Sequence, residues 1–504
     1  MIPGRGCQIN TICSYFSRRL RTILASVLWF LSSECARRAS CPHCLSLRIS
    51  LPPTQKKSAR FVAIKTLCEL QKSRKPVKNI FNAILAENPL ESNDRQLANN
   101  IIYGLLRNRE SLDIMLQYLC SQPLRKFKPF ILQALRVGLY QIMFLDRIPE
   151  SAAVNESVKA VKAARLPKRL HGFVNGVLRN SIRKQEELLA LIEDPARPVL
   201  NHPHWLVERW EKQYGKKEAT RICRQNNEQA VFSLQINSCF TDRKSFRETL
   251  DKNEIDTRHG IYCNDALILE DFHGGINELP GFDEGYFQVQ DQGAQLLTHL
   301  LGPMIQNGEY LDACTGVGGK TSVLIQLAEH VQARISAVEP DKARRQKFKE
   351  NMARLHPSLD VPIFPGSLQD FAISSSKRFH GILLDAPCSG TGVTRRHPDI
   401  RWNRRVEDFK HYQETQLELL QSATGLLTPH GILVYATCSL ETEENEQVIE
   451  QFLTRNPDFS LEDCTVFLPS TAHTFITNGY FAPLPGPEID GFFSARLRKK
   501  SPAN

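Results

Sequence analysis

Hydrophobic residues recur at helical spacing through the part of the chain that follows Pro52-Pro53. One helical face is formed by Ile131, Ala134, Leu135, Gly138 and Ile142. A second helix is expected around Val154, with Ser151 as its N-cap. Between these patterns lie the prolines at positions 123, 149 and 167, which we expect to separate helices. The spacing predicts an all-helical domain over residues 58–190.

From about residue 286 the pattern changes to short apolar runs that alternate with helical stretches. Each run ends at a polar or glycine-rich loop, as buried parallel strands do. Repeated strand–helix units predict a doubly wound α/β sheet over residues 286–500, in a Rossmann-like domain. The expected strands are Tyr310–Ala313, Arg334–Val338, Pro362–Phe364, Gly381–Leu384 and Gly431–Ala436, followed by a late antiparallel strand within 490–499.

Two stretches fit neither pattern. Residues 191–285 open with several prolines and then show a helical stretch at 202–215 and an alternating one at 230–237, which predicts a linker and a small α/β subdomain. Residues 1–57 fit no domain, and we interpret them as a start codon assigned too early. A transit peptide and a signal peptide are the alternatives. The apolar run at 23–31 is too short to cross a bilayer, and we expect no other transmembrane segment.

The basic character of the chain is concentrated near its N-terminus. Residues 58–187 hold 22 Lys or Arg against 11 Asp or Glu, whereas residues 188–504 hold 33 against 42. A basic helical domain in front of an acidic half favours a nucleic-acid partner. Solvated helix faces would explain the same charges without one.

The cysteines indicate a reducing compartment. Five of the 14 lie in the first 57 residues, and the others are scattered without the spacing of a disulfide framework. We therefore expect free thiols and a cytoplasmic protein. Cys41 and Cys44 have zinc-type spacing, but no second pair follows them, so no metal site is expected.

A glycine-rich loop follows the first predicted strand of the sheet and opens a helix. Glycines let a ligand approach the backbone, and the helix N-terminus offers N–H donors. A phosphate-binding P-loop is excluded, because Cys314 stands where that motif needs a glycine, six residues before its lysine. Glu339 ends the next strand and could accept both hydroxyls of a ribose. The pattern favours an adenosine-type cofactor without separating NAD from S-adenosylmethionine. The loop residues are Cys314, Thr315, Gly316, Val317, Gly318, Gly319 and Lys320.

Two cysteines follow later strands of the sheet: Cys388 in DAPCSGTG and Cys438 in YATCS. Carbon 5 of a pyrimidine becomes nucleophilic only after a thiolate adds to carbon 6, which is covalent catalysis. A carboxyl group such as Asp385 could stabilise the adduct at the ring, and Lys320 could lower a thiol pKa or hydrogen-bond the base. These residues predict methylation of carbon 5, but their spacing does not decide which cysteine attacks.

The core closely resembles the RNA cytosine-5 methyltransferases, and the whole arrangement resembles the Sun (RsmB) family of 16S rRNA methyltransferases. The resemblance rests on FQVQDQGAQLL (287–297), LDACTGVGGKTS (311–322), AVEP (337–340), LLDAPCSGTGVTRRHPDIRW (383–402), YATCSLETEENEQVI (435–449) and DGFFSARLRK (490–499). In the helical part, IPESAAVNESVKAVK (148–162) and FVNGVLRN (173–180) resemble the NusB-type RNA-binding domain.

The resemblance implies S-adenosylmethionine as the cofactor, bound by residues 314–320, Glu339 and Asp385. It implies 16S rRNA as the substrate, and we expect the protein to be a monomer. It also implies that Cys438 is the nucleophile and that Cys388 releases the product. The chain departs from the family pattern at Gly316-Val317, where Ala-Pro is usual, and at Ser367, where an acid is usual. The second departure puts the contact of Ser367 with adenine in doubt.

Other substrates and one other class of function remain open. A transfer RNA is the alternative substrate, and a non-catalytic NusB-like antitermination factor is the alternative class. The residues Arg395, Arg396, Arg401 and Trp402 follow the Cys388 motif, where they could grip phosphates and stack a base. A structural tryptophan with surface arginines is the alternative interpretation of this group.

Overall fold

The computed structural model describes residues 57–195, 197–272 and 274–501. The apolar run at 23–31, the Cys41–Cys44 pair and all but Lys57 of the extension predicted over residues 1–57 lie outside these residues. Within them, no helix is both long enough and apolar enough to cross a membrane. The same residues contain no group of three or more His, Cys, Asp or Glu side chains arranged to hold a metal ion.

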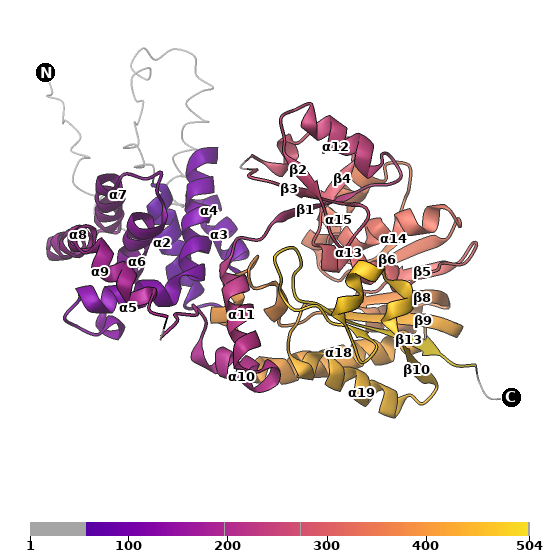
Figure 1. Ribbon diagram of the computed structural model, residues 1–504. Coiled ribbons are helices and arrows are strands. Elements are labelled where there is room, and N and C mark those ends of the chain that lie inside the picture. The colour runs from indigo at the N-terminus through magenta and orange to yellow at the C-terminus, as the bar shows by residue number, and fades with distance from the viewer. Residues whose placement is uncertain (1–56, 196, 273, 502–504) are drawn as a thin grey trace, which may run out of the picture. The chain divides into compact units, whose positions relative to one another are not determined.

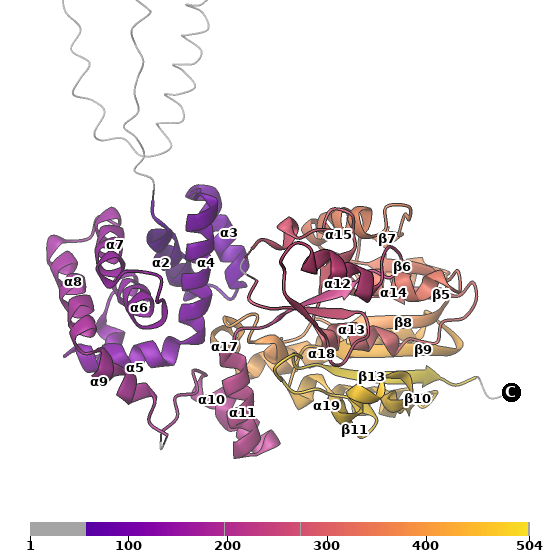
Figure 2. The same cartoon turned by 45° about the horizontal axis from the view of Figure 1, so that its top comes forward.

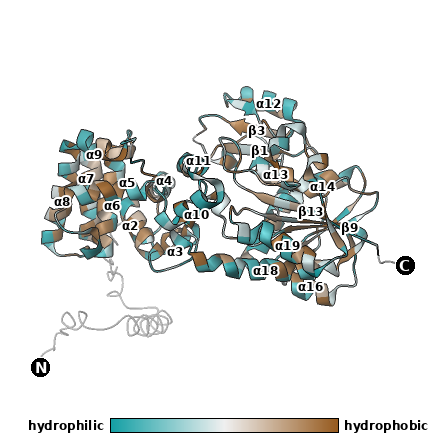
Figure 3. Cartoon of the chain, turned by 60° about the horizontal axis from the view of Figure 1, so that its bottom comes forward, coloured by the Kyte–Doolittle hydropathy of each residue, from teal (hydrophilic) through white to brown (hydrophobic). Residues whose placement is uncertain are grey.

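The first described part is all helical, as the spacing predicts (Figure 1). The predicted face of α6 is buried from Ile131 to Ile142, and Val154 of α7 packs in the same core. In Figure 3 these helices carry both hydrophobic and hydrophilic stretches, as helices with one buried face do. The helices are α2 (Ala59–Leu70), α3 (Val77–Glu87), α4 (Ser92–Arg107), α5 (Arg109–Leu119), α6 (Pro129–Phe144), α7 (Glu150–Ala163), α8 (Lys168–Arg183) and α9 (Gln185–Ile192).

Ser151 is not the N-cap of α7, so that prediction is wrong. The cap is Pro149, and the helix begins at Glu150. A helix can begin directly after a proline, because the first turn does not need an N–H from the residue that precedes it. Pro167 precedes α8 in the same way.

A four-stranded antiparallel sheet with the order β2-β3-β1-β4 follows two helices. Its core contains Phe246 and Phe287, both almost fully buried. The elements of this part are α10 (His204–Tyr214), α11 (Lys216–Asn227), β1 (Phe232–Ile236), α12 (Arg243–Asp251), β2 (Thr257–His259), β3 (Ala266–Leu269) and β4 (Phe287–Val289). The predicted helical stretch at 202–215 corresponds to α10 and the alternating one at 230–237 to β1.

The second sheet carries the predicted strand–helix units and has the order β11-β12-β13-β9-β8-β5-β6-β7, with β10 paired to β13. Strands β9, β8, β5, β6 and β7 are parallel, and β13 is antiparallel to β9, as predicted. The strands are β5 (Glu309–Asp312), β6 (Arg334–Val338), β7 (Ile363–Phe364), β8 (Phe379–Asp385), β9 (Leu427–Thr437), β10 (Phe459–Glu462), β11 (Ile476–Thr477), β12 (Tyr480–Phe481) and β13 (Phe493–Lys499).

Helices cover both faces of this sheet (Figure 1 and Figure 2). Alternate residues of β8 point to opposite faces. Leu383 packs in the core with Leu324 of α14, whereas Leu384 packs with Leu420 of α18. The helices of this domain are α13 (Gln292–His299), α14 (Gly319–Glu329), α15 (Lys342–Leu355), α16 (Leu368–Ser374), α17 (Ile400–Asn403), α18 (Val406–Thr424) and α19 (Glu446–Arg455).

Candidate active site

The predicted site residues follow strands that are neighbours in the sheet. The glycine-rich loop follows β5, Glu339 follows β6, Asp385 ends β8 and Cys438 follows β9. After β5 the chain adds β6 and then β7 on one side of β5. It then crosses to the other side and adds β8 and β9, so the strand order reverses between β5 and β8. Ligands of open α/β sheets bind beyond the carboxyl ends of the strands at such a point.

Cys388 and Cys438 lie side by side, although 50 residues separate them in the chain. Their Sγ atoms are 3.2 Å apart, and the backbone N–H of Cys438 donates to Cys388 Sγ at 3.4 Å. Both side chains are half-buried. The pKa of the Cys388 thiol is well above its usual range, because of its hydrogen bond with the Cys438 thiol and then because of burial. The structure therefore joins two thiols at the ends of two parallel strands.

Lys320 is part of the same cluster and is not a solvated helix-end lysine. Its Nζ donates to Asp385 Oδ2 at 2.6 Å, and only 16% of the lysine side chain is exposed. Burial alone would lower the pKa of Lys320, but the charge of Asp385 and the hydrogen bond between them raise that pKa overall. The ammonium group stays charged beside the strand-end carboxylate.

The glycine-rich loop contains two residues in the left-handed backbone conformation. Gly316 and Gly318 have positive φ angles of 59° and 92°, and a Cβ on Gly318 would come within 2.8 Å of Phe348. The side chain of Val317 is 43% exposed, and burial raises the pKa of the Cys314 thiol above its usual range. The loop thus has the left-handed turns that only glycine adopts without strain.

Two buried carboxyl groups, Glu339 and Asp312, flank this loop. Glu339 is 3% exposed and accepts the Asp341 N–H with Oε1 at 2.8 Å. Asp312, the last residue of β5, accepts from Thr321 with Oδ2, while its Oδ1 has no partner. Burial raises the pKa of Asp312 to about 6. Asp312 was missed in the sequence, although an acid directly before a glycine-rich loop could have indicated it.

Ser367 follows β7 and caps α16. Its hydroxyl donates to Asp370 Oδ2 at 2.6 Å and accepts the Asp370 N–H at 3.1 Å. The Asp370 carboxyl also accepts the N–H of Ser367. Both side chains are therefore engaged with each other, and a contact of Ser367 with adenine stays a prediction.

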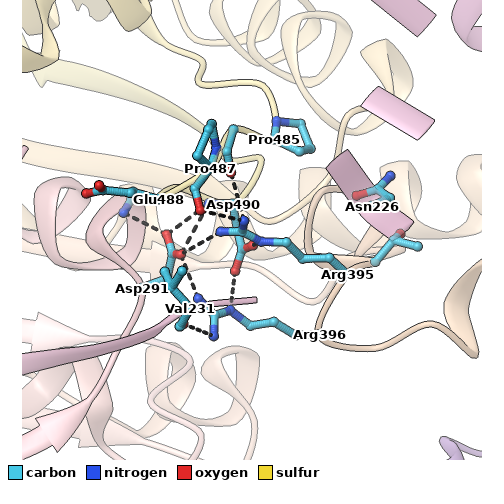
Figure 4. A network of polar contacts seen from close by, with 12 residues as sticks. Asn226, Val231, Asp291, Arg395, Arg396, Pro485, Pro487, Glu488 and Asp490 are labelled. Atoms are coloured by element: carbon cyan, nitrogen blue, oxygen red, sulfur yellow. Dashed lines mark hydrogen bonds and ion pairs between the residues drawn. The ribbon is translucent and has the colours of Figure 1, made fainter. Parts of the chain in front are cut away.

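The two arginines after the Cys388 motif bind protein groups, so the phosphate-gripping interpretation of Arg395 and Arg396 is wrong. Arg395 is fully buried and donates to Asp490 Oδ1 at 2.5 Å and to the Gly486 carbonyl at 2.7 Å. Arg396 contacts the other oxygen of Asp490 and donates to Asp291 Oδ2 at 3.0 Å (Figure 4). Two arginines and two aspartates neutralise each other inside the protein.

Arg401 and Trp402 also have protein partners. Arg401 is fully buried and donates to the carbonyls of Asn201 and Asn226 at 3.0 and 2.8 Å. The indole of Trp402 donates to the Leu106 carbonyl at 2.7 Å, and the Arg109 guanidinium lies over its ring. The structural interpretation of the tryptophan is correct, but Arg395 and Arg401 are fully buried and only Arg396 is partly exposed.

Three protein-family models match separate parts of the chain. The family model described as 16S rRNA methyltransferase RsmB/F matches residues 299–498. The NusB family matches residues 57–183, and the ferredoxin-like domain of RsmF/B-like methyltransferases matches residues 202–274.

Curated proteins match along most of the chain. A protein of Bacillus subtilis named "Probable ribosomal RNA small subunit methyltransferase B" is 32% identical over 88% of this chain and 100% of its own length. The ribosomal RNA small subunit methyltransferase B of Cronobacter sakazakii is 36% identical over 82% of this chain and 92% of its own.

Solved structures share the fold. The crystal structure of PH0851 is 23% identical, with a TM-score of 0.69, over 88% of this chain and 99% of that one. A methyltransferase homologue from Pyrococcus horikoshii is 28% identical, with a TM-score of 0.50, over 60% of this chain and 96% of that one. The resemblance seen in the sequence is confirmed: the chain belongs to the 16S rRNA methyltransferase RsmB/F family, with a NusB-like helical domain ahead of its methyltransferase domain.

Proposed function

We propose that the protein transfers a methyl group from S-adenosylmethionine to carbon 5 of one cytosine in 16S rRNA. The observation that carries the proposal is the pair of thiols, Cys388 and Cys438, with sulfur atoms 3.2 Å apart beside Asp385. Methylation at nitrogen or at ribose needs no thiol, whereas carbon 5 of cytosine does. The family membership supports RNA as the substrate.

The first step is assigned to Cys438. The proton of its thiol passes to solvent and the sulfur adds to carbon 6, so that the electron pair of the ring double bond moves toward carbon 5 and the ring. Asp385 and Lys320 form a charged pair at this point and would hydrogen-bond the polar edge of the ring, stabilising the charge that develops there. The base must leave its stack to enter such a site.

The second step assigns release to Cys388. Carbon 5 forms its bond to the methyl group as the bond between that methyl group and the sulfur of the cofactor breaks, and carbon 5 still carries its proton. Cys388, once its own proton has been lost to solvent, accepts that proton. The ring double bond re-forms, and the Cys438 sulfur leaves as a thiolate.

The cofactor, when bound, supplies an electrophilic methyl group. We assign its ribose to Glu339, its ammonium group to the unpartnered oxygen of Asp312, and its backbone contacts to residues 314–320. Asp385 ends β8. That strand lies between β5, which leads into this loop, and β9, which leads to Cys438. The solved structure of NSun6 from Pyrococcus horikoshii with SFG has the same fold, with a TM-score of 0.53 at 21% identity.

The test of the proposal uses the purified protein, methyl-labelled S-adenosylmethionine, and 16S rRNA presented free or in small subunits. We expect one 5-methylcytidine per RNA molecule, measured by nuclease digestion and mass spectrometry. Label in another nucleoside would refute the assigned chemistry, and label in transfer RNA alone would refute the assigned substrate. No transfer to any RNA would favour the non-catalytic alternative.

The RNA is expected to contact the exposed cations of α8. Arg179 and Arg183 are exposed and hydrogen-bond the amides of Asn175 and Asn180, and among the described residues neither forms an ion pair. Arg169 is exposed on the same helix. Exposed guanidinium groups of this kind can contact the phosphates of an RNA backbone.

Replacing Arg169, Arg179 and Arg183 together by glutamine should weaken RNA binding about tenfold or more near physiological salt and flatten its salt dependence. The measurement is the Kd for 16S rRNA at several salt concentrations, together with kcat, which should not change. A matched triple variant of α11 removes the exposed cations Lys216, Lys217 and Arg224. Equal losses in both triples would show that α8 has no special part in binding.

A further inference from the structure

A carboxylate that forms no ion pair with any described residue lies inside the loop that follows β9. The side chain of Glu444 is fully buried. Its Oε2 accepts the backbone N–H of Ser389 at 2.8 Å and the amide of Gln416 at 3.2 Å. Its Oε1 accepts the Ser439 hydroxyl at 2.7 Å.

Two of these three donors belong to the residues that directly follow the two cysteines. Ser389 follows Cys388, and Ser439 follows Cys438. The hydroxyls of the two serines also lie 3.1 Å apart. One carboxylate therefore joins the loops of two different strands at the point where each presents its thiol.

The loop is fixed around Glu444 from other sides as well. The hydroxyl of Tyr435 on β9 donates to the Glu444 carbonyl at 2.6 Å. The Arg404 guanidinium donates to the Ser389 carbonyl at 2.8 Å. The Glu444 carboxylate is therefore hydrogen-bonded to Ser389 and Ser439 in a loop that other hydrogen bonds also fix.

Burying this carboxylate is costly, and no opposite charge in the described part of the chain offsets the cost. Burial raises the pKa of Glu444, while hydrogen bonds from Ser389 and Ser439 oppose that rise. Glu441, three residues earlier and equally buried, differs because its carboxylate pairs with Arg209 and accepts from Trp210. A buried ionisable group held only by neutral donors is expensive to keep, which points to a role beyond stability.

We propose that Glu444 is a positioning residue that sets the separation of the Cys388 and Cys438 thiols through the two serines that follow them. This inference rests on the proposed function. The thiols act on carbon 5 and carbon 6, which are bonded neighbours in one ring, so their sulfur atoms must stay close together. A displacement of about 1 Å in such an arrangement costs about 10²-fold in rate.

The test compares two conservative variants, Glu444→Asp and Glu444→Gln. Aspartate keeps the charge but is one methylene shorter, so it cannot reach both serines. We expect kcat to fall about 10²-fold while KM for RNA and for S-adenosylmethionine changes less than about threefold. Glutamine keeps the length, and the Ser439 hydroxyl can turn to accept its N–H, so kcat should fall no more than about tenfold.

The control is Glu462→Gln, which removes a carboxylate paired with Arg496 and Arg498 on β13, away from the cysteines. Thermal unfolding of all variants separates loss of folding from loss of rate. If Glu444 serves only stability, both of its variants unfold earlier but the folded enzyme keeps its kcat, which overturns the inference. A larger loss in Glu444→Gln than in Glu444→Asp also overturns it, since charge and not reach would then matter. If neither the parent nor Glu462→Gln forms 5-methylcytidine, the proposed function itself fails.

Discussion

Cys438→Ala is expected to abolish methyl transfer, with kcat at least about 10⁴-fold lower, as when other enzymes lose a nucleophile. Carbon 5 of cytosine does not attack a methyl group by itself, and no other thiol can replace Cys438 in adding to carbon 6, because Cys388 occupies the release position. The measurement is transfer of labelled methyl to 16S rRNA. Cys388→Ala should differ in a second measurement, a denaturing gel. This variant should accumulate a covalent protein–RNA complex that survives the gel, whereas Cys438→Ala should form none.

Cys464→Ala is the control for this pair. Cys464 is fully buried and lies after β10, so its loss tests the effect of removing a core thiol. Cys464→Ala should transfer methyl groups at the rate of the parent protein and should form no stable covalent complex with RNA. A covalent complex in Cys438→Ala and not in Cys388→Ala would exchange the roles of the two cysteines. No complex in either variant would contradict the covalent mechanism.

The strands and their loops could be predicted because buried parallel strands leave a local signal. An apolar run that ends in polar residues is visible without knowledge of its neighbours. The carboxyl ends of such strands share one edge of the sheet, so Asp385, Cys438 and the glycine-rich loop were expected near one another. Their meeting in the structure follows from the strand order β9-β8-β5-β6.

The arginines could not be predicted in this way. A guanidinium group serves equally well for a phosphate or for a buried carboxylate, and the local sequence of Arg395 and Arg396 is the same in both cases. Their partner Asp490 lies 95 and 94 residues away in the chain. Only the fold brings that loop beside the Cys388 motif. Glu444 escaped notice for a related reason, because its donor Ser389 belongs to another strand's loop.

Loss of Asp490 should cost a large part of the stability of the domain. Asp490 and Arg395 are both fully buried, and Asp490 accepts from Arg395 and Arg396 with its two oxygens. Asp291 remains the only other acid that the structure pairs with these arginines in the described part of the chain. Removing one partner of a buried ion pair leaves an uncompensated charge, which typically destabilises a protein by about 3–5 kcal/mol.

We therefore expect Asp490→Ala to lower the free energy of unfolding of the domain by about 3–5 kcal/mol in urea titration. Asp490→Asn should cost less, because its amide oxygen still accepts one guanidinium N–H. The exposed Asp458, replaced by alanine, is the control and should change the value by no more than about 0.5 kcal/mol. If Asp490→Ala were as stable as the parent, the two arginines would have to find other acceptors or water. Arg395 has no exposed surface through which to do so. Such a result would mean that the loop containing Asp490 can leave the Cys388 motif, and the fixed site described above would be wrong.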